Sequence, residues 1–170
     1  MYELFDKHFG KPPERKQPNI KSKLCVFGFE ASPTKSKRDR MTRLNMVYNV
    51  KGLAVDYKAG MAVWHSKTEI DFFMEGDTKA NEFGTGNSMY TWEAQGGFNR
   101  QQKVSVPTVD MVSFVKGLYK KYEPEFILGK MDIEGAEFDV LPKMLEGGVL
   151  CSGSGFDIIT IEYHNRMFHD

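Results

Sequence analysis

The chain has 170 residues, a length that suits one folded domain. Apolar residues make up 41% of it and charged residues 27%, which excludes the composition of a disordered segment and allows a buried core. The 23 lysines and arginines balance 23 aspartates and glutamates, so no overall basic field indicates nucleic acid as a partner. We expect a single domain over residues 1–170.

The cysteines and the apolar runs exclude further classes of protein. Cys25 and Cys151 lie far apart without zinc-ligand spacing, so the sequence predicts neither a disulfide framework nor a structural zinc site. No apolar run approaches the ~20 residues of a membrane span, and the first residues lack the pattern of a secretory signal. We expect a soluble protein, with the cytoplasm as its compartment.

The first half of the chain predicts a strand, a helix and then further strands. After a proline-rich connection over residues 10–23, the apolar run Leu24–Phe29 is typical of a buried parallel strand. Apolar residues recur at helical spacing over Thr34–Asn49, which predicts an amphipathic helix. Three later segments are predicted as strands: Val50–Tyr57, Gly60–His65 and the alternating Glu69–Met74. We expect a hairpin around Ser66–Thr68 to join the last two.

Residues 75–102 predict a long loop insertion, because they are rich in glycine, asparagine and threonine. Loops of this length often bind ligands, although an insertion without such a role explains the composition equally well.

The second half alternates strands and helices. Asp110 ends an extended segment that starts at Val104 and could cap a helix, which Glu123-Pro124 would end. The next elements are predicted as a strand, a helix closed by two glycines, and a last strand: Phe126–Ile133, Glu137–Leu145 and Asp157–Tyr163. This alternation predicts an α/β fold with a mostly parallel, doubly wound sheet and helices on both faces.

Acidic side chains stand at three predicted strand ends, where open parallel sheets bind their ligands. Glu30 could accept the hydroxyls of a ribose, or it could simply cap the following helix. Asp132, Glu134 and Glu137 could cap a helix, hold a cofactor amine, orient a hydroxyl or bind a divalent cation. We favour a functional role for Asp132 and capping for Glu137.

The last acidic residue comes with a histidine. In an extended strand Glu162 and His164 would lie on the same side and could reach one ligand. His164 could act as a general base, or it could be an inert surface histidine.

Several of these segments resemble the FkbM family of methyltransferases. Val26–Pro33 resembles the family's second-strand motif, and Met61–Trp64 followed by a turn and Ile70–Phe73 resembles its third strand and hairpin. Val106–Asp110 and then Lys130–Leu141, containing Asp-Ile-Glu-Gly-Ala-Glu, are similar to its most specific signature, and Ile159–His164 looks like the following strand. The resemblance covers residues 24–164.

The resemblance implies a class I, Rossmann-like fold that binds S-adenosylmethionine and methylates a hydroxyl of a small molecule or glycan. It implies that Glu30, followed by Ala31, holds the cofactor ribose, and that Ala62 and Trp64 lie near the adenine. It places Asp132 beside the methionine part of the cofactor or the reacting hydroxyl, with Glu134 close by. The predicted catalytic residues are Asp132, Glu134 and His164, and no metal is assigned.

One family feature is missing from the sequence. A first strand with a turn resembling Asp-x-Gly-Ala-Asn-x-Gly should precede Tyr2–Phe9, and no such residues are present. We therefore expect an N-terminally truncated methyltransferase domain. Two alternatives stay open: a non-catalytic binding or scaffold remnant of the same fold, and a nucleotide- or sugar-handling Rossmann enzyme of another reaction class.

Overall fold

The computed structural model describes residues 24–50, 54–74, 89, 102–151 and 153–164. These residues fall into two compact units, which we describe separately. Of the described residues, the first unit comprises 24–30, 34–50 and 54–59, and the second comprises 31–33, 60–74, 89, 102–151 and 153–164. Most of the predicted loop over residues 75–102 lies outside the described residues.

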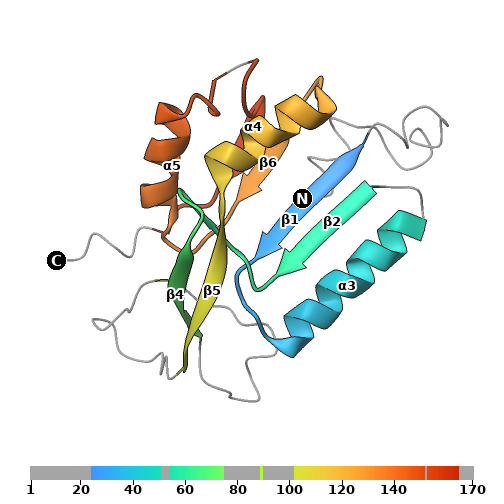
Figure 1. Cartoon of the computed structure of the whole chain (residues 1–170), viewed down its shortest axis with the longest axis vertical. Helices are drawn as coiled ribbons and strands as arrows, with labels where there is room; N and C mark the ends of the chain where they lie inside the picture. The colour runs from blue at the N-terminus through green and yellow to red at the C-terminus, as the bar shows by residue number, and fades with distance from the viewer. Residues whose placement is uncertain (1–23, 51–53, 75–88, 90–101, 152, 165–170) are drawn as a thin grey trace. The chain divides into compact units, whose positions relative to one another are not determined.

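The first unit is a strand, a helix and a parallel strand. Strand β1 (Cys25–Glu30) pairs in parallel with β2 (Ala54–Ala59), with Cys25 opposite Ala54 and Glu30 opposite Ala59. Helix α3 (Lys35–Val50) connects them and runs alongside β2 (Figure 1). The predicted strand and helix are confirmed, and β2 begins four residues later than its predicted segment.

Side-chain amides attach α3 to β2. The Asn45 side chain accepts from the Tyr57 N–H at 2.7 Å and donates to the Tyr57 carbonyl at 2.9 Å. Asn49 makes the same pair of bonds with the N–H and carbonyl of Val55, at 3.0 and 3.1 Å. The helix side that bears Met41, Leu44 and Tyr48 is partly buried, and none of the helix residues is fully buried. The amide bonds therefore add to a limited apolar contact.

Replacing Asn45 by alanine is expected to lower the free energy of unfolding by about 1–2 kcal/mol, because two hydrogen bonds worth about 1 kcal/mol each are lost. Urea denaturation followed by circular dichroism measures the change. Met46→Ala is the control, since the neighbouring Met46 side chain is 66% exposed. Equal stability of the two variants would contradict a structural role for the Asn45 amide.

In the second unit β5 (Gln102–Asp110) is the central strand. It pairs in parallel with β3 (Ala62–Trp64) and antiparallel with β4 (Glu69–Met74). The predicted hairpin between β3 and β4 is therefore wrong, because β5 lies between them. The buried Thr108 hydroxyl on β5 holds the connecting turn, since it donates to the Ser66 carbonyl at 2.7 Å and accepts from the Thr68 N–H at 2.8 Å.

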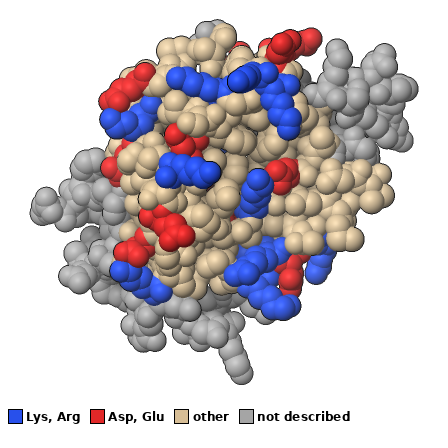
Figure 2. Space-filling model, in the orientation of Figure 1, with Lys and Arg blue, Asp and Glu red and all other residues tan. Residues whose placement is uncertain are grey.

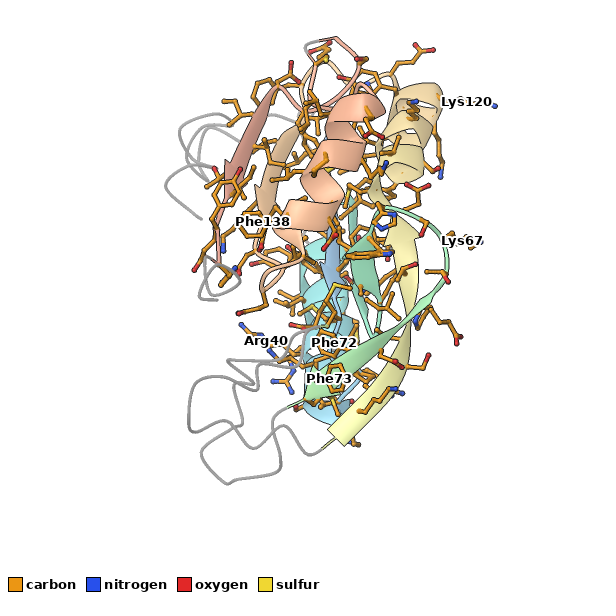
Figure 3. All side chains as sticks on the ribbon, turned by 90° about the vertical axis from the view of Figure 1, so that its left-hand side faces the viewer. Arg40, Lys67, Phe72, Phe73, Lys120 and Phe138 are labelled. Atoms are coloured by element: carbon orange, nitrogen blue, oxygen red, sulfur yellow. The ribbon has the colours of Figure 1, made fainter. Side chains whose placement is uncertain are left out.

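The predicted alternation of β4 is confirmed. Glu69 and Asp71 are exposed, whereas Phe72, labelled in Figure 3, and Met74 are buried in a cluster with Ala62 and Val106. Partly buried apolar residues pack against this cluster: Ala31, Ile70 and Val104.

Helix α4 (Met111–Tyr122) follows β5 directly. The Asp110 carboxylate caps it, as predicted, by accepting from the N–H groups of Val112 and Ser113. The helix ends at Glu123, which has the left-handed φ of 45° and donates its N–H to the Tyr119 carbonyl. The predicted helix boundaries are thus confirmed.

The second unit ends with a parallel pair of strands and a helix. Strand β6 (Leu128–Met131) pairs with β7 (Ile158–Ile161), and helix α5 (Glu137–Glu146) lies between them in sequence. Both strands are shorter than predicted.

The fold is of mixed α/β class, and the described strands pair in three groups rather than as one continuous sheet. Strand β4 is antiparallel to its neighbour, and the other pairs are parallel. Acidic and basic side chains are scattered among one another on the face drawn in Figure 2, in keeping with the balanced composition. Among the described helices, none has the length and hydropathy needed to cross a membrane.

Candidate functional site

Charged side chains gather where β6 and β7 end. Strand β6, the loop after it, the first turn of α5 and the residues after β7 supply them: Lys130, Asp132, Glu134, Glu137, Glu162 and His164. We call this set the β6–β7 site. The carboxyl ends of parallel strands are the usual place for ligand sites in α/β folds.

The loop between β6 and α5 turns through two left-handed residues. Glu134 has a φ of 53° and Gly135 a φ of 102°. Glycine adopts this region freely, but a residue with a Cβ atom is disfavoured there by about 1–2 kcal/mol. The turn directs the Glu134 side chain towards His164, at 3.6 Å from its Nε2 atom. Surrounding bonds must hold such a strained residue in place.

Glu137 supplies these bonds from a fully buried position. Its Oε1 accepts from the Ile133 N–H at 3.0 Å, and its Oε2 accepts from the Gly135 N–H at 2.9 Å. The carboxylate thus bridges the loop that carries Asp132 and Glu134.

His164 connects the segment after β7 to this loop. Its Nδ1 lies 3.0 Å from Glu137 Oε1, and its Nε2 lies 3.7 Å from Asp132 Oδ1. The His164 side chain is 17% exposed, so its Nε2 lies near the carboxylates and is largely shielded from water. The neighbouring Tyr163 ring, 5.9 Å by centroid from the ring of Phe138 on α5 (Figure 3), attaches the same segment to the helix.

Lys130 and Glu162 form the outer part of the site. Lys130 Nζ lies 2.8 Å from Asp132 Oδ2 and 3.5 Å from Glu162 Oε2. Its hydrogen bond with Asp132 raises the pKa of Lys130 above its ordinary value, so the ammonium is charged at neutral pH. The Oδ2 atom of Asp132 is therefore paired with the Lys130 ammonium, and its Oδ1 atom faces the His164 ring.

The predicted position of Glu162 and His164 on one strand is wrong in detail, because β7 ends at Ile161 and both residues follow it. Their side chains nevertheless converge on Asp132, Glu162 through Lys130 and His164 directly. The structure therefore brings together all three predicted catalytic residues, Asp132, Glu134 and His164.

The same three residues could hold a metal ion. One ligand atom from each lies within 4.8 Å of the others, and carboxylate oxygen with imidazole nitrogen suits several divalent cations. Exposed acidic groups also gather in this way without an ion, and we assign none.

The contact between Glu137 and His164 was not predicted from the sequence. A signal for the burial of Glu137 is present, because Glu137, Val140 and Met144 follow the i, i+3, i+7 spacing of one helix face. All three are fully buried. A carboxylate on the apolar face of a helix indicates a buried polar partner, although the spacing does not identify His164 as that partner.

Glu30, the predicted ribose ligand, ends β1 in the first unit. Its carboxylate is partly buried, and Oε2 lies 3.4 Å from Lys37 Nζ on α3. A carboxylate at the carboxyl end of a parallel strand accepts hydrogen bonds from ribose hydroxyls in many nucleotide-binding folds. The chemistry and position of Glu30 fit a nucleoside cofactor.

The other predicted cofactor residues belong to the second unit. Ala62 is buried in its apolar cluster, and Ala31 packs against the same cluster. Trp64 is half-buried at the end of β3, with its ring centroid 4.3 Å from that of His65. Their roles towards a cofactor stay predictions.

Comparison with known proteins supports the family suggested by the sequence. Residues 17–170 match the family model described as the methyltransferase FkbM domain. No curated protein matches the chain, and no solved structure does either. Because the match spans most of the chain, including both units and the whole β6–β7 site, the chain belongs to the FkbM methyltransferase domain family.

Proposed function

We propose that this chain is an S-adenosylmethionine-dependent O-methyltransferase domain of the class I, Rossmann-like type, acting on a hydroxyl of a small molecule or glycan. Membership of a methyltransferase family supports the reaction type. The observation that carries the choice of a hydroxyl is His164, whose Nε2 faces the carboxylates of Asp132 and Glu134 at a strand end. A hydroxyl must lose its proton during methylation, and histidine is the commonest general base.

The site residues would act in defined ways. S-adenosylmethionine supplies the transferable methyl group when bound, and Glu30 would accept hydrogen bonds from its ribose hydroxyls. His164 Nε2 would take the proton of the acceptor hydroxyl as its oxygen is methylated. The imidazolium formed would be stabilised by Asp132 and Glu134, at 3.7 and 3.6 Å. Positioning of the reacting atoms would supply much of the remaining acceleration.

Incubation with methyl-labelled S-adenosylmethionine and a panel of sugars, glycans and small alcohols tests the proposal. The expected result is labelled ether product that forms together with S-adenosylhomocysteine. Calorimetry on the same preparation, shown to be folded by circular dichroism, measures cofactor binding. A folded chain without affinity for S-adenosylmethionine would favour the scaffold alternative, and selective binding of NAD would favour another Rossmann enzyme.

Replacing Glu30 by glutamine is expected to weaken S-adenosylmethionine binding about 10- to 100-fold. A hydrogen bond to a charged group is worth about 1.5–3 kcal/mol, and each 1.4 kcal/mol is about tenfold in affinity. Calorimetry measures the dissociation constant.

Asp56→Asn is the matched control for this test, because Asp56 lies on β2 of the same unit and its side chain is 49% exposed. An equal loss in both variants would show that Glu30 acts through the stability of the first unit. Unchanged affinity in Glu30→Gln would refute its role at the ribose.

A further inference from the structure

We infer that Glu137 is a positioning residue, whose buried carboxylate holds His164 with the proton on Nδ1 and leaves Nε2 as the proton acceptor. This inference rests on the proposed function and deepens it, because it names what prepares the general base. It also gives Glu137 a second role beyond the helix-terminal one expected from the sequence.

The hydrogen bonds of Glu137 indicate which nitrogen of His164 holds the proton. Its two oxygens receive three bonds, from the N–H groups of Ile133 and Gly135 and from His164 Nδ1 at 3.0 Å. An ionised carboxylate accepts hydrogen bonds and has none to donate. The neutral imidazole that satisfies it must therefore carry its proton on Nδ1.

The surroundings of Nε2 leave this nitrogen as a proton acceptor. The groups facing His164 are Glu137 from α5 and the carboxylates of Asp132 and Glu134 from the loop, with Lys130 of β6 behind Asp132. Asp132 and Glu134 stand 3.7 and 3.6 Å from Nε2, beyond the 2.7–3.2 Å of a charge-assisted N–H···O bond. At these distances neither carboxylate is hydrogen-bonded to Nε2, so this nitrogen can accept from the substrate hydroxyl.

The carboxylate of Glu137 is buried at a cost. Glu137 is 0% exposed, and removing a carboxylate from water costs several kcal/mol before its partners repay it. The Ile133 and Gly135 N–H groups offset part of this cost, and the bond from His164 Nδ1 offsets more of it. Holding the His164 ring gives a functional reason for the buried charge of Glu137, because the wrong tautomer of a catalytic histidine cannot accept a proton at the required nitrogen.

Glu137→Gln tests the inference, since the amide keeps the volume but has one accepting atom in place of two. If its oxygen faces Ile133 and His164, its NH2 group opposes the Gly135 N–H. In the opposite orientation the NH2 group opposes the Ile133 N–H and faces His164 Nδ1, where it selects the Nε2–H tautomer. We expect a population of that tautomer, a kcat lowered about 100-fold, and a KM for S-adenosylmethionine within about twofold of the unmodified chain.

Long-range 1H–15N correlation spectra of the 15N-labelled full chain read the tautomer directly. The chain has four histidines, and His164→Gln assigns the signals of His164 by their loss. At about pH 9 the unmodified chain should show His164 protonated on Nδ1 alone. Glu146→Gln, on the exposed end of the same helix, is the matched control and should change neither spectrum nor kcat.

Each outcome decides the inference. An Nε2–H or doubly protonated His164 in the unmodified chain overturns it. If Glu137→Gln does not fold, the spectrum of the unmodified chain still decides. A chain that shows the Nδ1–H tautomer but methylates no acceptor would refute the proposed function and leave the positioning of His164 by Glu137 standing.

Discussion

Replacing Glu137 by alanine is expected to lower the free energy of unfolding by about 3 kcal/mol. The change removes the acceptor of the Ile133 and Gly135 N–H groups, and each buried donor left unpaired costs about 1–3 kcal/mol. It also leaves a void beside Val140, which is fully buried on the same helix face. The strained turn at Glu134 loses the bonds that hold it.

Urea denaturation followed by circular dichroism measures this loss. Glu146→Ala, in the last turn of α5, is the control, because its side chain is 65% exposed and its removal should change stability by no more than about 0.5 kcal/mol. A loss below about 1 kcal/mol in Glu137→Ala would contradict the buried network.

Replacing His164 by glutamine is expected to lower the kcat of methyl transfer by about 10²- to 10⁴-fold, the usual contribution of a general base. Binding of S-adenosylmethionine should be unchanged, because the ring is proposed to act on the acceptor hydroxyl. Single-turnover rates with labelled cofactor measure the first quantity, and calorimetry measures the second.

Tyr163→Phe is the control for the histidine, since it alters the neighbouring residue, which is 59% exposed, by one hydroxyl. His164→Ala adds a further check, because free imidazole in solution should restore part of the rate by taking the proton. A His164→Gln variant with kcat within about threefold of the unmodified chain would remove His164 from the mechanism.

The sequence predicts local elements well in this chain, because their signals are local. The cap at Asp110 and the strand β4 each depend on residues a few positions apart. The pairing of β3 and β4 was predicted wrongly because it depends on β5, which begins at Gln102 and inserts between them from far along the chain. No alternation within residues 60–74 carries information about that strand.

The same difference between local signals and contacts of distant residues applies to the site. Asp132, Glu134 and His164 were predicted from strand ends and from the family resemblance, and the structure brings them together. The contact from Glu137 to His164 joins residues 27 positions apart, and nothing in either local pattern names the other partner. The burial of Glu137 could have been predicted from its helix face, whereas the identity of its third hydrogen-bond donor could not.

The two asparagines of α3 have a consequence for how the first unit meets other chains. Strand β2 has β1 on one side, and its outward backbone groups at Val55 and Tyr57 are bonded to the Asn49 and Asn45 amides. An open strand edge is a template for adding a strand from another molecule, which leads to aggregation or domain swapping. Here two side chains mimic a neighbouring strand, so the helix protects this edge without an additional strand.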